Sequence, residues 1–379
     1  MPNGPLHGVT VLDLTEFIFG PYATQTLGDL GADVIKVENP EGDRQRRGTK
    51  HVTNASMGAG FMALNRNKRS ITLDLKKDED REKLRALIPT AQVFIHNVRA
   101  EGMARLGFSY EEVAKLNPSI VYVHCVGYGS DGPYAGRQAF DDLVQAASGA
   151  ADLLPRLDGN EDMRLLPSFV ADKVSSLHAL YGVLAALFHR ERTGEGQFVE
   201  VPMLESFTSF LMAEHLYGAT FEPPVSHVGH TTALANDRRP LKTKDGHIAI
   251  QPVSRATAAK FLELGGIPNA YESDRFVNAG SGKAKVAAYY EMLREAALTH
   301  TTEEWMRIGE ANRIPIMRAN TLEEVLEDPH LKAVGFFDVR EHPTEGKWRA
   351  MRPPLRFSKT PSSIRREPPL PGQNNDEFE

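Results

Sequence analysis

An acidic side chain, Asp172, stands where an irregular apolar segment gives way to a long apolar helical pattern. Val174, Leu177, Leu180 and Leu184 recur at three- and four-residue steps, which predicts a helix with one buried face. An aspartate just ahead of such a helix can accept hydrogen bonds from the first free backbone N–H groups. The pattern alone therefore predicts that Asp172 is an N-cap, and other parts of the chain must decide whether it does more.

Basic residues gather beside predicted strands in the first third of the chain. Arg66, Lys68 and Arg69 precede one strand and Lys76 follows it, whereas Asn97, Arg99 and Arg105 follow the next strand and Arg137 ends a Gly-rich turn. Cations after successive parallel strands converge on one edge of a sheet and can hold phosphate groups there. We expect an anionic, phosphate-bearing ligand at this edge.

Other motifs point away from several classes of site. Gly20 is followed by Pro21 rather than by a G-x-G-x-x-G run, so the pyrophosphate cradle of a dinucleotide site is missing. No G-x-S-x-G elbow is present, and His227 and His230 lack nearby Cys or clustered acids, so we expect no metal site. The one cysteine, Cys125, excludes an intramolecular disulfide and is expected to be buried.

The elements that position these residues alternate between strand and helix over the first 130 residues. Strands are predicted at 8–15, 32–38, 70–75, 92–97 and 119–129, with helices at 20–31, 76–91 and 109–117 between them. This alternation predicts an α/β fold with a mostly parallel sheet, whose ligands bind beyond the carboxyl ends of the strands. Residues 219–240 lack periodicity and read as a domain crossing, and the last six residues are expected to fray.

Composition narrows the class of protein further. The chain has 379 residues, of which 41% are hydrophobic and 25% charged, and this suits two globular domains. A net charge of −6 gives no general attraction to nucleic acid or to anionic membranes. The N-terminus lacks the pattern of a signal peptide, and we expect a cytoplasmic protein.

Five ordered segments resemble the class III coenzyme A transferase family, also called the CaiB/BaiF family. They are residues 12–43, 65–75, 127–133, 169–197 and 328–335, of which "GADVIKVE" and "LAALFHRERTGEGQ" are the most specific parts. The resemblance implies a Rossmann-like large domain at 1–218 and 331–379 and a smaller α+β domain with linkers at 219–330. It also implies an interlocked homodimer, an exception to the usual rule against threaded chains.

The resemblance further implies a role for Asp172. In the family's transferases an aspartate at the matching position is the nucleophile, and a carboxylate of this kind splits one difficult exchange into easier steps through mixed anhydrides and an aspartyl-CoA thioester. The implied substrates are an acyl-CoA and a carboxylic acid acceptor, with coenzyme A as a substrate rather than a permanently bound cofactor.

The CoA contacts implied by the resemblance follow the predicted strands. They are Phe17, Ile18 and Phe19; Leu73, Asp74, Leu75 and Lys76; Asn97, Val98, Arg99 and Arg105; and Val126, Gly127, Tyr128, Gly129 and Arg137. The chain departs from the family in two places. Asn39 stands where many members have a nucleotide-contacting arginine, so Arg44 or another cation must substitute, and the glycine-run loop of some formyl and oxalyl transferases is absent between residues 219 and 250.

Three alternatives stay open at this point. The family includes 2-methylacyl-CoA racemases, but Phe140 precedes Asp141 where their acid–base His–Asp pair would lie, and half of that pair is missing. An isomerase that moves CoA between two carboxyls of one dicarboxylic acid is a second alternative. A protein that binds acyl-CoA without catalysis is the third.

Overall fold

The computed structural model describes residues 4–47 and 50–378. The chain divides into two compact units. The larger unit takes the residues up to Pro155, then Asn160–Leu216 and the residues from Gly335 onward, and the smaller unit takes Arg156–Gly159 and Tyr217–Val334.

The larger unit is built on six parallel strands in the order β3-β2-β1-β4-β5-β6. The strands are β1 (Thr10–Leu14), β2 (Asp33–Glu38), β3 (Lys68–Thr72), β4 (Val93–His96), β5 (Val121–Val126) and β6 (Gln197–Pro202). The β-branched runs of β1, β2, β4 and β5 are buried on both faces, as expected for parallel strands covered by crossover helices, whereas the edge strand β6 is largely only partly buried. The predicted α/β fold with a parallel sheet is confirmed.

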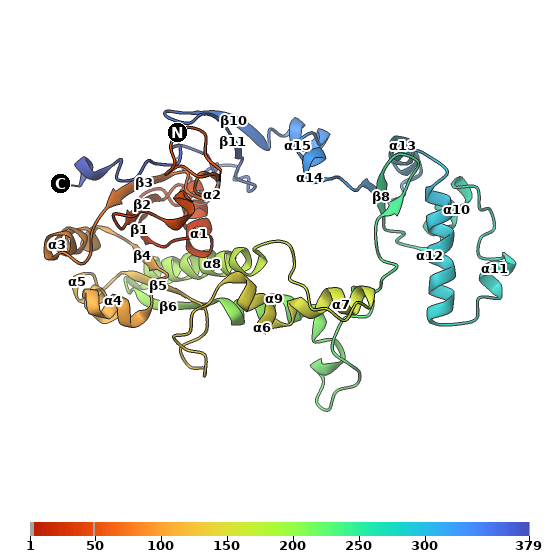
Figure 1. The fold of residues 1–379 in the computed structure, drawn as a ribbon, viewed down its shortest axis with the longest axis horizontal. Coiled ribbons are helices and arrows are strands. Elements are labelled where there is room, and N and C mark those ends of the chain that lie inside the picture. Colours follow the sequence, from red (N-terminus) through yellow and green to blue (C-terminus); the bar gives the residue numbers. More distant parts are fainter. Residues whose placement is uncertain (1–3, 48–49, 379) are drawn as a thin grey trace. The chain divides into compact units, whose positions relative to one another are not determined.

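Helices cover both faces of this sheet (Figure 1). One face packs against α1 (Phe19–Asp29), α6 (Asp141–Ser148), α8 (Val170–Thr193) and α9 (Met203–His215). The other packs against α3 (Asp78–Leu87), α4 (Ala100–Leu106) and α5 (Tyr110–Leu116). The larger unit also contains the short helix α2 (Ala59–Leu64) and 3-10 turns at Arg44–Arg46, Ile88–Thr90, Ala150–Asp152 and Asn375–Glu377. The residues of helix α7 (Leu153–Asp158) are divided between the two units, and the 3-10 turn at Tyr217–Thr220 belongs to the smaller one.

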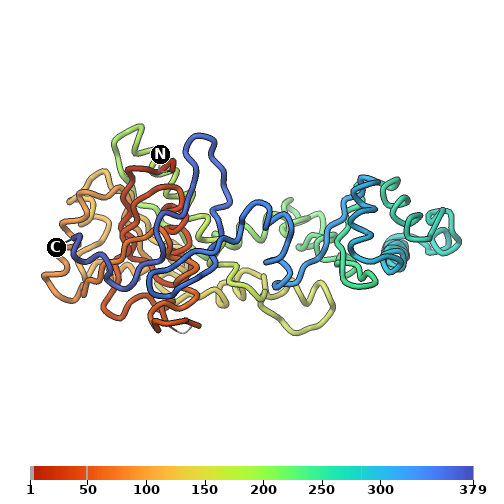
Figure 2. The backbone as a smooth tube through the Cα atoms, turned by 90° about the horizontal axis from the view of Figure 1, so that it is seen from above, coloured from red at the N-terminus to blue at the C-terminus, as the bar shows by residue number. Residues whose placement is uncertain are grey.

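The C-terminal segment returns to the N-terminal part of the sheet (Figure 2). After an antiparallel hairpin of β10 (Phe337–His342) and β11 (Gly346–Met351), the chain runs along the outer edge of β3. Asn374 exchanges hydrogen bonds with the backbone of Ser70 at 2.9 and 3.0 Å, and Asn375 accepts the N–H of Thr72 at 2.9 Å. The prediction that the tail frays is therefore wrong for residues 374–378.

The smaller unit has an antiparallel sheet in the order β7-β8-β9. Its elements are β7 (Leu241–Lys242), β8 (His247–Ile250), α10 (Arg255–Leu264), α11 (Asp274–Val277), α12 (Lys283–Ala297), α13 (Thr302–Asn312), β9 (Ile316–Arg318), α14 (Leu322–Val325) and α15 (Pro329–Ala333). Trp305 lies in its core, stacked on Phe261 at 4.3 Å between ring centres. Over the described part of the chain, no helix combines the length and the apolar character that crossing a membrane requires.

Candidate functional site

Asp172 lies inside helix α8, in its first turn. The helix begins at Val170 and Phe169 occupies the N-cap position, so the prediction that Asp172 caps the helix is wrong. The capping acceptor is instead the carboxylate of Asp141, whose Oδ1 accepts the backbone N–H of Asp172 at 3.0 Å. An acceptor supplied by another helix leaves the side chain of Asp172 free of that task.

Asp141 is itself held firmly. It begins α6, is buried, and its Oδ2 accepts the side-chain amide of Gln145 at 2.5 Å. The same Gln145 amide group accepts the N–H of Leu166 at 2.8 Å and donates to the carbonyl of Ser168 at 3.0 Å. One network thus ties α6 to the segment that leads into Asp172. The sequence signal for it is the i, i+4 spacing of Asp141 and Gln145, which sequence reasoning did not use.

The surroundings of Asp172 favour its neutral form. Burial raises the pKa of the Asp172 carboxyl to about 7, and the negative charge of Asp141 adds to this rise. Across residues 4–47 and 50–378, no group donates a hydrogen bond to this carboxylate. The carboxylate of Asp172 is partly buried, accepts no hydrogen bond from the described residues and has a pKa of about 7. Its lone pairs are therefore free to attack an electrophile.

The loop after β1 comes close to this aspartate. The hydroxyl of Ser176, one turn beyond Asp172 on α8, lies within hydrogen-bonding distance of the carbonyl oxygens of Phe19, at 2.6 Å, and of Asp172, at 2.7 Å. Phe17, which has a φ of 70°, meets Phe140 edge to face at 6.4 Å between ring centres. The predicted segment Phe17, Ile18 and Phe19 is therefore brought together with Asp172 and with the start of α6.

The remaining predicted residues lie along the carboxyl edge of the sheet, after β3, β4 and β5. Lys76, Arg99, Arg105 and Arg137 are exposed, whereas Leu73 is buried. Arg99 is the N-cap of α4, and Arg105 lies in its last turn. Since α4 begins at Ala100, Arg105 stands about 8 Å along the helix from its start.

Two of these residues hold the neighbouring loops. The side-chain amide of Asn97 accepts the N–H of Glu16 at 3.1 Å and donates to its carbonyl at 2.9 Å. The carbonyl of Val98 faces two histidine rings, His96 at 3.1 Å and His124 at 2.9 Å. These contacts fix the backbone at the carboxyl end of β4.

The Gly-rich turn after β5 needs its glycines. A Cβ on Gly127 would lie 2.1 Å from the Cβ of Ala139, and one on Gly129 would lie 2.7 Å from the carboxylate of Glu205, which accepts the Gly129 N–H at 2.9 Å. Tyr128 packs on Tyr134 in the same turn, where the ring centres are 5.5 Å apart. Val126 ends the strand, and the guanidinium of Arg137 lies 4.4 Å from the ring centre of Tyr134.

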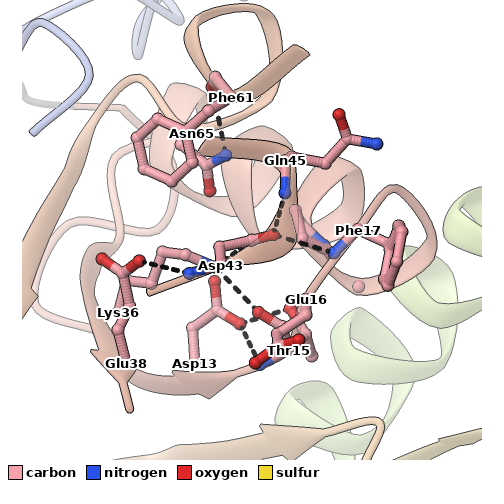
Figure 3. Close-up of polar contacts among 12 residues, drawn as sticks. Asp13, Thr15, Glu16, Phe17, Lys36, Glu38, Asp43, Gln45, Phe61 and Asn65 are labelled. Carbon is pink, nitrogen blue, oxygen red and sulfur yellow. Dashed lines mark hydrogen bonds and ion pairs between the residues drawn. The ribbon is translucent and has the colours of Figure 1, made fainter. Parts of the chain in front are cut away.

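A buried charged network lies beneath the loop after β1 (Figure 3). Lys36 pairs with Asp43 at 2.8 Å and donates to the Thr15 carbonyl at 2.7 Å, while Asp43 accepts the N–H of Phe17 at 3.3 Å. Burial alone would raise the pKa of Asp13, but the nearby lysine ammonium groups hold it at about 2. The network supports the loop that carries Phe17.

Ion pairs of three basic residues near β3 correct part of the sequence prediction. Lys68 pairs with Asp13 at 3.0 Å inside the core, and Arg66 pairs with Asp29 at 2.6 Å. Arg69 lies within β3 and pairs with Asp33 and Glu377. Lys68 and Arg69 belong to the strand rather than preceding it, and all three cations are engaged in ion pairs. Their partners come from distant segments, which the local pattern could not show.

At position 39, where many family members have a nucleotide-contacting arginine, this chain has an asparagine that makes polar contacts with the loop after β1. Asn39 donates to the carboxylate of Glu16 at 3.1 Å. Arg44 is largely exposed, and its guanidinium lies 5.6 Å from the ring centre of Phe17 and 3.9 Å from Glu16. Arg46, by contrast, is buried in a bidentate pair with Glu38. Of the two arginines, only Arg44 is open to a ligand.

Among the residues that the structure describes, no group of three or more His, Cys, Asp or Glu side chains is arranged to hold a metal ion.

Comparison with known proteins gives the class of enzyme. The chain is 32% identical over 387 residues to the succinate–glutarate CoA-transferase of Agrobacterium fabrum, an alignment that covers 99% of this chain and 95% of that protein. It is 31% identical over 380 residues to the succinyl-CoA:glutarate CoA-transferase of Homo sapiens, covering 98% and 84%. A crystal structure of a CaiB/BaiF family protein from Brucella suis superposes with a TM-score of 0.85 at 29% identity, covering 100% of both chains.

These likenesses define an acyl-CoA:carboxylic acid CoA-transferase. The model of CoA-transferase family III matches residues 6–375, and the chain belongs to that family. The family resemblance read from the sequence and the predicted transferase activity are thereby confirmed.

Proposed function

We propose that Asp172 is the nucleophile of a ping-pong CoA transfer. Its carboxylate attacks the thioester carbonyl of the acyl-CoA donor, the C–S bond breaks, and CoA leaves as a thiolate with a mixed anhydride in its place. The thiolate then attacks the aspartyl carbonyl of this anhydride, which releases the donor acid and leaves an aspartyl-CoA thioester. The observation that supports this role is the carboxylate of Asp172, which accepts no hydrogen bond from any described residue while Asp141 caps the helix.

The second half reverses the first with another acid. The acceptor carboxylate attacks the aspartyl thioester and expels CoA thiolate, and the thiolate attacks the acceptor's carbonyl in the new anhydride. This step restores the carboxylate of Asp172 and releases the new acyl-CoA. Partly buried surroundings exclude water, which would otherwise hydrolyse the anhydrides.

The CoA moiety, we propose, lies along the carboxyl edge of the sheet. Its support is the set of exposed cations at Lys76, Arg99, Arg105 and Arg137, which follow successive strands. Arg44 takes the nucleotide contact that Asn39 cannot make, because its guanidinium is exposed beside the ring of Phe17.

For the acids, we propose small dicarboxylates as donor and acceptor. Two relatives are named for the succinyl and glutarate pair, and this is the basis of the proposal. Succinyl-CoA with glutarate is the first pair to test, against acetate and propionate as monocarboxylate controls. A test with one doubly labelled dicarboxylic acid distinguishes transfer between molecules from transfer within one molecule.

We further propose that the enzyme is a homodimer of interlocked subunits, each with a CoA-binding domain at 1–218 and 331–379 and a smaller domain at 219–330. The outward side of α8 supports a partner: Leu177, Tyr181 and Phe188 are 50%, 57% and 64% exposed. Seven-residue spacing places Tyr181 and Phe188 on one stripe, and such a stripe needs covering. Light scattering that gives a monomer at micromolar concentration would contradict the proposal.

Trapping the covalent intermediate tests the nucleophile directly. Wild-type enzyme incubated with succinyl-CoA and then with hydroxylamine should carry a hydroxamate on the peptide that contains Asp172, located by mass spectrometry. Asp172→Asn should lose transfer by several orders of magnitude, because the covalent route is closed. Full transfer by this variant, or a label on another residue, would show that the nucleophile lies elsewhere. Exchange of the α-proton of an acyl-CoA without transfer would instead support the racemase alternative.

A further inference from the structure

Two histidines form a stacked pair at the carboxyl end of the sheet. His96 ends β4 and His124 is its registered neighbour on β5, with ring centres 4.4 Å apart and planes 23° from parallel. Both rings are buried, at 0% and 7% exposure. Neither belongs to the residues that the proposed transfer uses.

Both rings bond to a single acceptor. Nδ1 of His96 and Nε2 of His124 lie 3.1 and 2.9 Å from the carbonyl oxygen of Val98. A carbonyl oxygen has two lone pairs and no proton to give, so each of these nitrogens must carry the hydrogen. The shared carbonyl acceptor therefore fixes which ring nitrogen carries the hydrogen: Nδ1 in His96 and Nε2 in His124.

Burial favours the neutral form of both rings, whereas the hydrogen bond to the Val98 carbonyl, which a charged ring would also donate, acts in the opposite direction. Nε2 of His96 is buried without a hydrogen-bond partner among the described residues, so a proton there would be unsupported. Burial lowers the pKa of His96, and the neighbouring His124 lowers it further; burial also lowers the pKa of His124. The ionisable groups that act on His124 are Glu101 of α4 and Glu200 of β6, both of which favour its charged form. The rest of the pair's setting is aromatic: Phe94, Tyr122 and Phe198.

The carbonyl of Val98 belongs to the loop that leads into α4. Asn97 precedes it and clamps the backbone of Glu16, and Arg99 follows it as the N-cap whose carbonyl accepts the N–H groups of Gly102 and Met103 at 2.9 and 3.0 Å. Fixing the Val98 carbonyl therefore fixes the start of α4 and the direction in which Arg99 leaves the sheet.

We propose that His96 and His124 are positioning residues for the coenzyme: through their two hydrogen bonds to the Val98 carbonyl they hold the β4–α4 loop in its CoA-binding form. This inference rests on the proposed binding of CoA at the carboxyl edge. It adds a support of two hydrogen bonds behind the residues that are proposed to touch the ligand.

Two substitutions of His124 separate the hydrogen-bond donor from the ring. His124→Gln keeps an N–H donor near the position of Nε2, whereas His124→Phe keeps a stacked ring without a donor. In calorimetry with CoA, His124→Gln should bind with an affinity close to that of the wild type. His124→Phe should bind roughly tenfold more weakly, as loss of one hydrogen bond predicts. Steady-state kinetics of His124→Phe should show a raised KM for acyl-CoA with little change in kcat.

Hydrogen exchange tests the pair without any ligand. In His124→Phe the amides of Gly102 and Met103 should exchange roughly tenfold faster than in the wild type, and His124→Gln should remain close to the wild type. Unchanged exchange of these amides in His124→Phe would overturn the inference, whether or not CoA binds. A CoA affinity of His124→Phe equal to that of the wild type would also overturn it. If the wild type binds no CoA while the amides respond as described, the proposed CoA site is wrong and the positioning of the loop still stands.

Discussion

Replacing Asp172 by Asn should make the protein more stable while it abolishes transfer. The pKa of the Asp172 carboxyl rises from 3.8 to about 7 on folding, chiefly through burial and then through the charge of Asp141. A group with a raised pKa binds its proton more tightly in the folded state, so its ionisation costs stability as the pH rises through this window. Above pH 7 the whole cost is present, and an uncharged amide of similar shape avoids it.

The size of the gain follows from the shift. A rise of about 3 units at 1.36 kcal/mol per unit gives a ceiling of roughly 4 kcal/mol. Since Asp172 is only partly buried, solvent screening reduces this to about 2 kcal/mol. At pH 5 the wild-type carboxyl is already largely protonated in the folded protein, and the advantage of Asp172→Asn should shrink to less than half.

Urea unfolding of the wild type and of Asp172→Asn at pH 8 and pH 5 measures this difference. Asp142→Asn is the matched control, because Asp142 is exposed, lies next to Asp141, and its substitution changes the net charge equally. The unfolding midpoint of Asp172→Asn should exceed both others at pH 8. Equal midpoints at pH 8, or a gain that is the same at both pH values, would refute the idea that Asp172 is held at an electrostatic cost.

Three further outcomes follow from the same contacts. Asp141→Asn removes the charge that helps to raise the pKa of Asp172, so the acid limb of the kcat/KM profile for transfer should move to lower pH; an unmoved limb would contradict this. Arg105→Ala should weaken CoA binding in calorimetry by about 1.5–3 kcal/mol if its guanidinium contacts a phosphate, whereas Lys115→Ala, on α5, should leave it unchanged. Lys36→Met leaves buried carboxylates without their cation, so the free energy of unfolding should fall by about 3–5 kcal/mol in chemical denaturation; a loss below 1 kcal/mol would show that the pair is dispensable.

The sheet could be predicted from the sequence because its strands are short β-branched runs separated by helical patterns. The residues near Asp172 could be predicted only in part. Its own position was visible as the start of an apolar helix, but the acceptor that caps that helix, Asp141, lies 31 residues away. A cap supplied through space leaves no local signal, so the local pattern predicts the nearest acidic residue as the cap.

The basic residues before and within β3 illustrate the same limit. Lys68 is a cation in a polar stretch, and exposure is the ordinary expectation for such a residue. Its partner, Asp13, lies on β1 and becomes its neighbour only when the sheet has formed. Whether a lysine faces a ligand or a buried carboxylate is decided by strand order, which periodicity does not encode. For Arg44, by contrast, a gap in the family pattern at Asn39 predicts a nucleotide contact, and Arg44 is exposed beside Phe17.

The cover that the C-terminal segment gives to β3 has a consequence for the order of synthesis. Ser70 and Asn374 are 304 residues apart in the chain, so the outer edge of β3 leaves the ribosome long before the residues that pair with it. At about 5–20 residues per second, this edge waits roughly 15–60 s for its cover. An uncovered edge strand is a template for pairing with other chains. A message truncated near its end would thus yield a chain with a nearly complete sheet and an open edge, prone to associate with its own copies.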